Sequence, residues 1–319
     1  MHAHQSSLRD ARQSLESCWT SRPDTVVSMG RLSFVARAAL RAAMIVTVTS
    51  CTASRSVTQA CPVSRFRSAK PLVIAHASST HFGPANTLAM MRAAVAAGAD
   101  VVDADVRMTA DGVLVASHDD DLRATTDTAG RIHTTTIAEL RTLDAARTWP
   151  GPNNDYPLRG HGVTIPTVEE ILDAFPHRRI SLEFKTTGGE HNLCTLLRRL
   201  RRTNDVYVGS AGDAAVDTFK PICPEVATTV TDALVVTMNN ARANATPWCS
   251  PSPLGQPPYM IGTRKLVTSE SVRWDHEHGM AVYTWTLDDP AGLAAAADTG
   301  VDGVYTGRAD LARAIFDRR

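Results

Sequence analysis

The stretch that decides the fold is Val101–Asp119, VVDADVRMTADGVLVASHD. Its β-branched residues predict a strand, on which Asp103 and Asp105 point to one face because side chains alternate along a strand. Asp111-Gly112 is a strong signal for a two-residue hairpin turn, because both of its central residues need positive φ. With that turn, His118 returns opposite Asp105. The stretch therefore predicts two acids and an imidazole on one local element; an edge hairpin with solvated side chains is the alternative.

Apolar runs recur along the rest of the chain and alternate with segments of helical spacing. We expect strands at 71–76, 100–106, 179–185, 206–210, 225–230, 258–262, 281–286 and 302–305, and helices that include 86–97, 166–175, 190–202, 268–279, 289–298 and 308–317. Eight such strands over about 250 residues predict an α/β fold of the (β/α)8 TIM-barrel type, with its site at the carboxyl ends of the strands. A doubly wound open sheet is the alternative, but no glycine-rich phosphate loop follows the first strand.

One connection is unusually long. After the hairpin at 101–119, the chain runs to Thr164 through turn-rich sequence with one expected helix, at 137–145. Long loops in compact domains are usually functional. We therefore expect a small insertion, about 120–164, over the mouth of a barrel that spans 70–319.

Polar residues lie at the expected strand ends. His76 ends the first strand, and Glu183 and Lys185 lie two apart near the end of the strand at 179–185. A barrel brings these residues into one pocket with Asp103, Asp105 and His118. Three carboxylates need a cation when they are buried together, and oxygen ligands favour Mg²⁺ or Ca²⁺ over zinc. A Glu183–Lys185 ion pair and a histidine satisfied at a strand end are the alternatives.

Two histidines beside such a cation suit acid–base catalysis near neutral pH, one accepting a proton and the other donating one. The cation and Lys185 would neutralise charge on a transferring phosphoryl group. Which histidine is the acid and which the base stays open.

The first fifty residues are of a different kind. Residues 1–28 read as an N-terminal extension, and Met29 is an alternative start to Met1. A basic segment, the apolar run 42–50 and Cys51 follow, as in a lipoprotein-type signal peptide. The run is too short to span a bilayer. We expect export, with an acyl anchor on Cys51 as the one membrane contact or else plain secretion, and a flexible tether at 51–69.

Charge and cysteine content limit the other functions. The formal net charge is zero and no basic block occurs, so nucleic acid is not an expected partner. In an oxidising compartment Cys61, Cys194, Cys223 and Cys249 could form disulfides. Cys223–Cys249 is the preferred pair because the two residues flank one loop-rich segment, whereas Cys194 lies in a helical pattern of leucines and reads as a buried apolar residue.

The chain resembles the glycerophosphodiester phosphodiesterases. The resemblance rests on motifs in the family's order, IAHAS (74–78), PANT (84–87), GADVVDADV (98–106), DGVLVASHDDDLRATTDTAGRI (111–132), AELRTLDA (138–145), IPTVEEIL (165–172), SLEFK (181–185), VYTWTLDD (282–289) and GVDGVYTGRADL (300–311). It implies a barrel with a small insertion and catalytic histidines at His76 and His118. It also implies one Mg²⁺ or Ca²⁺ at Asp103, Asp105 and Glu183, with Lys185 near the phosphate and Trp285 near a small phosphodiester substrate.

The chain also departs from the family pattern. Ala77 replaces the arginine that contacts the phosphate in the family, Ala85 replaces a glutamate, Asp103 is one methylene shorter than the usual acid, and Gly307 replaces an aspartate. The related sphingomyelinases D also lack that arginine. A metal-dependent glycerophosphodiester phosphodiesterase is therefore expected. A sphingomyelinase D-like phospholipid phosphodiesterase and a degenerate barrel that binds a ligand without turnover are the alternatives.

Overall fold

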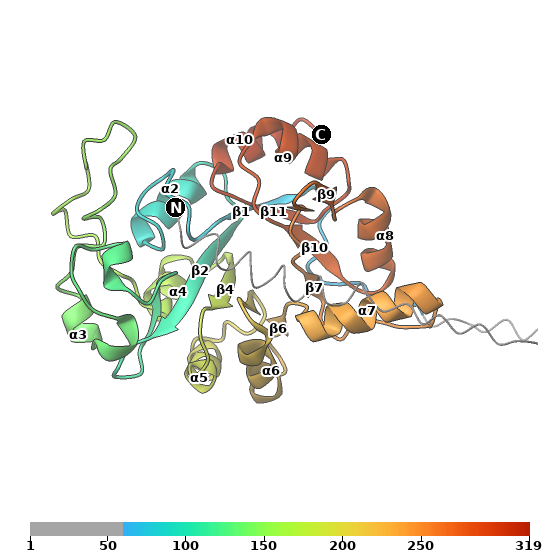
Figure 1. Cartoon of the computed structure of the whole chain (residues 1–319), viewed down its shortest axis with the longest axis horizontal. Helices are drawn as coiled ribbons and strands as arrows, with labels where there is room; N and C mark the ends of the chain where they lie inside the picture. The colour runs from blue at the N-terminus through green and yellow to red at the C-terminus, as the bar shows by residue number, and fades with distance from the viewer. Residues whose placement is uncertain (1–59) are drawn as a thin grey trace, which may run out of the picture. The chain divides into compact units, whose positions relative to one another are not determined.

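Eight parallel strands form the centre of the structure, a computed structural model that describes residues 60–319. They are β1 (Leu72–Ala75), β2 (Val101–Met108), β4 (Arg179–Phe184), β5 (Val206–Ser210), β6 (Ala227–Thr228), β7 (Leu254–Gly255), β10 (Ala281–Thr284) and β11 (Gly303–Thr306). Their order in the sheet is β6-β5-β4-β2-β1-β11-β10-β7. A single parallel bridge, Thr229 to Leu254, joins the two ends. The expected TIM barrel is confirmed (Figure 1).

Helices surround the barrel (Figure 1). They are α2 (Leu88–Ala96), α4 (Val168–Ala174), α5 (Glu190–Leu200), α6 (Asp213–Ile222), α7 (Asp232–Asn244), α8 (Ser269–Glu277), α9 (Pro290–Ala297) and α10 (Ala309–Phe316). Side-chain oxygens cap five of them, which satisfies free amides at the helix starts; the capping residues are Thr87, Thr167, Thr231, Thr268 and Asp289. α6 and α7 were not among the helices expected; Pro221 interrupts the pattern of α6, and α7 buries only Ala241.

The expected strand at 258–262 is wrong. The barrel strand at this place is β7, and the chain at 260–261 instead forms β8 (Met260–Ile261), which pairs with β9 (Arg264–Lys265) outside the barrel. Pro257 and Pro258 separate β7 from β8. Because proline has no amide hydrogen to donate to a ladder, β7 ends before them, and only an isolated parallel bridge from Pro258 to Trp285 continues the pairing beyond.

The hairpin register differs by one residue from the expectation. β2 pairs with β3 (Leu114–Ala116) so that Val106 faces Ala116, and the Ser117 amide donates to the Asp105 carbonyl at 2.9 Å. Ser117, not His118, is therefore opposite Asp105. The cause is a loop of three residues, 110–112, closed by the Thr109 amide donating to the Val113 carbonyl, with Gly112 at φ 80°.

The segment before β1 is fixed to the barrel from Cys61 onward, unlike the tether expected there. Phe66 is fully buried in the barrel interior, and Arg179, the first residue of β4, lies over its ring at 4.7 Å. Phe66 therefore fills the end of the barrel where the strands begin. The expected extension, signal peptide, Cys51 anchor and tether up to residue 59 lie outside the described residues.

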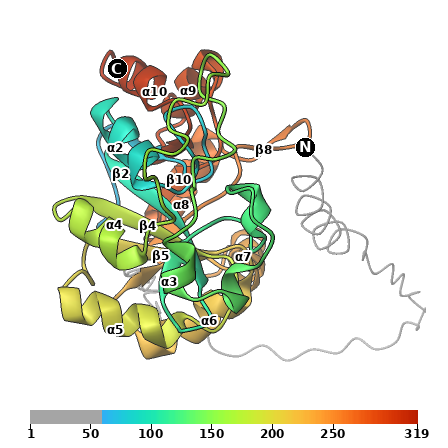
Figure 2. The same ribbon diagram turned by 90° about the vertical axis from the view of Figure 1, so that its left-hand side faces the viewer.

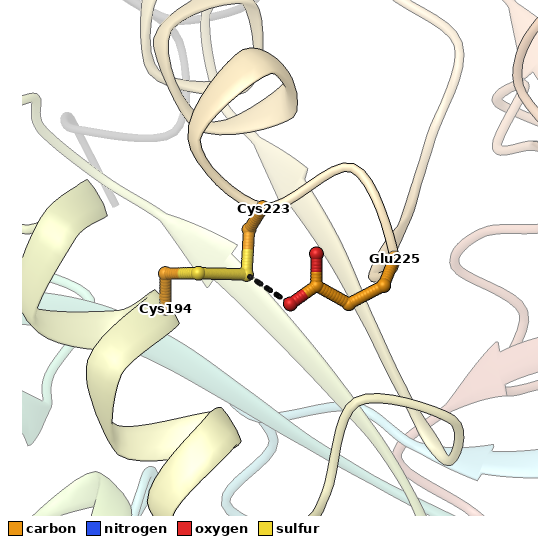
Figure 3. Close-up of side chains that lie close together, drawn as sticks. All are labelled: Cys194, Cys223 and Glu225. Carbon is orange, nitrogen blue, oxygen red and sulfur yellow. Dashed lines mark hydrogen bonds between the residues drawn. A yellow bond between two sulfur atoms is a disulfide. The ribbon is translucent and has the colours of Figure 1, made fainter.

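Within residues 60–319, the disulfides are Cys61–Cys249 and Cys194–Cys223, so the preferred pair Cys223–Cys249 is wrong. Cys194 is buried, as expected, but it lies on α5 against the end of α6 and bonds to Cys223 (Figure 3). The pairing was predicted wrongly because it was based on closeness in sequence. In the fold, the segment before β1 lies against the loop that leads into β7, which brings Cys61 next to Cys249.

The expected insertion is present. It contains short helices at Leu122–Ala124, Ile132–Thr134 and α3 (Ile137–Leu140), the last of which is shorter than expected. A small core of its own holds it together, with Leu122, Ile132 and Leu140 buried against Val115 of β3. Within residues 60–319, no helix combines the length and the apolar character that crossing a bilayer requires.

Candidate active site

Most of the predicted site residues meet at the carboxyl ends of β1, β2 and β4. His76 directly follows β1, Asp103 and Asp105 lie on β2, and Glu183 on β4 pairs with Asp105 in the sheet register. Lys185 follows β4, where its amide donates to the Val106 carbonyl at 3.1 Å. Parallel neighbouring strands bring these ends together, as the barrel requires.

Lys185 is the counter-ion of two of the acids. Its Nζ lies 3.0 Å from Asp105 Oδ1 and 2.9 Å from Glu183 Oε1, and its side chain is only 10% exposed. Burial works against its charge, but the two carboxylates outweigh burial and raise the pKa of Lys185. The Glu183–Lys185 ion pair, given above as the alternative for these two residues, is therefore present, and Lys185 pairs with Asp105 as well.

Asp105 is also held by hydrogen bonds that the strand pattern did not predict. Its Oδ2 accepts from Ser78 Oγ at 2.9 Å and from Asn86 Nδ2 at 2.7 Å, and Asn86 Oδ1 accepts from the Asp105 amide at 2.9 Å. Burial would raise the pKa of Asp105, but Lys185 and the bond from Asn86 outweigh it and lower that pKa. Asp105 is therefore a fixed anion.

Asp103 is buried beside Asp105 with less compensation. Its Oδ2 accepts from the Ala77 amide at 3.1 Å. Burial and the neighbouring Asp105 carboxylate raise the pKa of Asp103 to about 8. Among residues 60–319, no basic side chain forms an ion pair with Asp103. The single charge of Lys185 therefore does not balance the two carboxylates of Asp103 and Asp105, and a further cation would stabilise them.

The donor chemistry of Asp103, Asp105 and Glu183 suits a hard divalent cation, although their ligand atoms do not all lie within 4.8 Å of one another in this structure. Asp103, Asp105 and Glu183 offer carboxylate oxygens alone, the ligands that Mg²⁺ and Ca²⁺ prefer. In the described part of the chain, the one group of acids, histidines and cysteines whose ligand atoms all lie within 4.8 Å of one another is Cys194, Cys223 and Glu225. The two sulfurs there are bonded to each other and are not thiolate ligands (Figure 3).

The two histidines have different surroundings. His76 is partly buried, and burial lowers its pKa although the Asp105 carboxylate acts in the opposite direction. His118 is 52% exposed, with its Nδ1 3.3 Å from Asp119 Oδ1. Each is close enough to influence Asp105 or the other electrostatically. The two histidines therefore lie at the same end of the barrel in different surroundings, one partly buried and one exposed.

Arg107 and Asp288 join this site without having been singled out in the sequence. Arg107 donates to the His118 carbonyl through Nε at 2.9 Å and Nη2 at 2.7 Å. Asp288 Oδ1 accepts from Thr306 Oγ1 at 2.9 Å and from the Gly307 amide at 2.7 Å, and its charge acts on His76. Arg107 had a signal because it continues the alternation of Asp103 and Asp105, and Asp288 lies within the motif VYTWTLDD (282–289).

Trp285 lies apart from the acids, at the end of β10 and on the same face of the barrel. Its ring nitrogen donates to the Gln256 carbonyl at 2.8 Å, and the residue is 41% exposed. Ala77, at the position of the family's arginine, is fully buried.

Residues 76–311 match the model of the glycerophosphoryl diester phosphodiesterase family. The chain is 27% identical over 255 residues to "Probable glycerophosphodiester phosphodiesterase 2" of Mycobacterium tuberculosis, covering 78% of this chain and 91% of that one. It is 26% identical to the glycerophosphodiester phosphodiesterase of Bacillus subtilis, covering 75% of this chain and 84% of that one.

Solved structures share the fold. The glycerophosphodiester phosphodiesterase of Agrobacterium tumefaciens has a TM-score of 0.62 at 23% identity, covering 76% of this chain and 99% of that one. A phosphodiesterase of Oleispira antarctica, solved in complex with the product sn-glycerol-3-phosphate, has a TM-score of 0.60 at 23% identity, covering 78% of this chain and 97% of that one.

Proposed function

Because the chain belongs to the glycerophosphoryl diester phosphodiesterase family, we propose that it is a metal-dependent hydrolase that splits glycerophosphodiesters into glycerol 3-phosphate and an alcohol. One observation carries the proposal: at one end of the barrel, the buried Asp105 and the neighbouring Glu183 share Lys185 as their counter-ion, beside two histidines. The relatives named for this activity and the product complex of the Oleispira enzyme support the same substrate class.

His76 and His118 would move the protons. The oxygen of a water molecule forms the new bond to phosphorus while one histidine takes a proton from that water. The bond from phosphorus to the alcohol oxygen breaks, and the other histidine gives that oxygen a proton. The partly buried His76 and the exposed His118 hold protons in different surroundings, as such a division of work needs.

Asp103, Asp105 and Glu183 would hold a Mg²⁺ or Ca²⁺ ion, which neutralises charge on the phosphoryl group when it is bound. Lys185 adds a fixed positive charge at the same place, because both of its carboxylate partners hold it there. Asn86 and Ser78 fix the Asp105 carboxylate from the other side.

Export remains part of the proposal. Two disulfides, Cys61–Cys249 and Cys194–Cys223, support an oxidising compartment. An acyl anchor on Cys51 is proposed from the sequence alone.

The decisive test is an assay of the purified full chain on glycerophosphocholine and on bis(p-nitrophenyl) phosphate, in EDTA and with added Mg²⁺ or Ca²⁺. We expect glycerol 3-phosphate from the first substrate, and no turnover in EDTA. The matched control is the double variant His76→Ala/His118→Ala, which should be inactive with either cation. Absence of turnover of both substrates under every condition would favour the ligand-binding barrel instead.

A further inference from the structure

A group of hydrogen-bonded side chains lies inside the barrel beside Asp103. It consists of Ser181 on β4, Tyr207 on β5, Tyr305 on β11 and Gln256, which follows β7. β4 and β5 lie side by side, with α4, α5 and α6 around them (Figure 2). In the strand order β5 and β11 are on opposite sides of the ring, so the group crosses the interior of the barrel.

The Tyr305 hydroxyl is the centre of this group. Its oxygen lies 3.1 Å from Ser181 Oγ and 3.0 Å from the Tyr207 hydroxyl, and it accepts from Gln256 Nε2. Tyr207 is fully buried, and Tyr305 is only 5% exposed. Because each hydroxyl has one proton to donate, the order of donation within the group is restricted.

The order of donation leads toward Asp103. Asp103 and Ser181 pair in the sheet register; burial raises the pKa of Asp103, and a hydrogen bond from Ser181 opposes that rise. A carboxylate that binds a cation can only accept, so Ser181 gives Asp103 its one proton and can accept from Tyr305. Tyr305 accepts in turn from the amide nitrogen of Gln256, which can only donate. Each donor is therefore polarised by the one behind it, which strengthens the bond to the carboxylate.

We propose that Tyr305 is a positioning residue: through Ser181, its hydroxyl holds the Asp103 carboxylate in the orientation in which it binds the divalent cation. Groups that hydrogen-bond to a metal ligand fix its orientation and tune the affinity for the metal. Asp103 depends on such support, because Lys185 forms its ion pairs with the other two acids. Besides Ser181, the Ala77 amide donates to Asp103. The inference rests on the proposed cation site, of which Asp103 is a part.

Tyr283 offers a matched control in the same barrel interior. It is a fully buried tyrosine, and its ring centroid lies 5.7 Å from that of Tyr207. Its hydroxyl donates to the Phe66 carbonyl at 3.1 Å and accepts from Arg179 Nη1 at 2.8 Å, at the end of the barrel where the strands begin. Tyr283→Phe therefore removes a buried hydroxyl that makes these bonds and none to Ser181.

Isothermal titration calorimetry of the full chain with Mg²⁺ or with Ca²⁺ tests the role of Tyr305. We expect Tyr305→Phe to weaken cation binding by about tenfold or more, the usual effect of removing a group that supports a metal ligand. Ser181→Ala should weaken it at least as much. The double variant should bind no more weakly than Ser181→Ala alone, because Tyr305 acts through Ser181. Tyr283→Phe should bind as the parent does.

Equal dissociation constants for the parent and Tyr305→Phe would overturn the inference. An equal loss in Tyr283→Phe would do the same, because it would show a general effect of a missing buried hydroxyl. Additive losses in the double variant would also overturn it, since Tyr305 would then not act through Ser181.

Turnover of glycerophosphocholine is measured in parallel. A parent that binds the cation without turnover would refute the proposed function, whereas the calorimetry would still decide the role of Tyr305. A parent that binds neither Mg²⁺ nor Ca²⁺ would overturn both the proposed cation site and this inference, because Asp103 would then have no cation to bind.

Discussion

Arg107 and His118 are joined by two hydrogen bonds from one guanidinium to one backbone carbonyl, at 2.9 and 2.7 Å. Both residues belong to the β2–β3 hairpin: Arg107 lies on β2, and His118 comes just after β3. The guanidinium therefore fixes where the exposed histidine leaves its strand.

We predict that Arg107→Ala lowers kcat/KM by about tenfold, because a small displacement of a catalytic group is costly. Arg107→Lys should restore only part of the loss, since an ammonium cannot reproduce the two-pronged bond. Arg123→Ala, an exposed arginine of the insertion paired with Asp121, is the control. Steady-state kinetics that do not distinguish Arg107→Ala from this control would contradict the role.

His76→Ala and His118→Ala should each lower kcat by roughly 10²-fold or more, because each removes a proton-transfer group. The melting temperature should change little for His118, which is exposed. The exposed His177, outside the site, serves as control in His177→Ala. Full activity in either site variant would refute the assignment.

Lys185→Met removes the counter-ion of a buried carboxylate. We expect the free energy of unfolding without cation to fall by about 3–5 kcal/mol, the usual cost of breaking a buried ion pair. Added Mg²⁺ or Ca²⁺ should recover part of it, since a cation at Asp105 and Glu183 supplies the missing charge. Urea titrations with and without cation measure both, and Lys70→Met, at an exposed lysine, should be neutral. Unchanged stability in Lys185→Met would mean that the ion pair contributes nothing.

Asp103 should make the cation-free protein less stable as the pH rises. Its folded pKa of about 8 lies above its ordinary value of 3.8, so the folded state binds the extra proton between these values. The resulting stability is complete below the lower value and is lost as the pH passes the upper one. In EDTA, the melting temperature should fall between pH 5 and about 8, less so in Asp103→Asn. Asp217→Asn, an exposed acid on α6, should keep the parent's slope. Parallel slopes for parent and Asp103→Asn would exclude this role.

The two disulfides should differ in their contribution. Cys61–Cys249 closes 188 residues and Cys194–Cys223 closes 29. In the chain-entropy account, these loops correspond to about 5 and about 3.5 kcal/mol. Replacing each pair by serine and measuring chemical unfolding should show the larger loss for Cys61–Cys249. The reverse order would show that native-state contacts outweigh the loop effect.

The sequence predicted the site strands well because their pattern is local. β1 is a continuous apolar run, whereas β2 and β4 alternate polar with apolar residues, and a parallel barrel turns the ends of all three to one side. Family motifs then marked His76 and Glu183 at two of those ends. The residues predicted in this way lie on a strand or directly after one; they are His76, Asp103, Asp105, Glu183 and Lys185.

The rest of the fold and of the site could not be predicted from the sequence, because it depends on contacts that no local pattern reveals. The register moved by one residue because the loop at 110–112 has three residues, which the Asp111-Gly112 signal alone does not reveal. The bonds from Asn86 and Ser78 to Asp105 join segments far apart in sequence. The Cys61–Cys249 pair depends on where the chain before β1 runs across the completed barrel.

The ring of barrel strands is closed between β6 and β7 by a single bridge, from Thr229 to Leu254. The two strands at this junction, β6 and β7, have two residues each. Cys223 lies shortly before β6 and Cys249 shortly before β7, so each disulfide has one cysteine next to the junction. In the strand order, the junction of β1 and β2 lies directly opposite the junction of β6 and β7. We therefore expect local opening of the barrel to begin at the β6–β7 junction, which lies farthest from the strands that carry His76, Asp103 and Asp105.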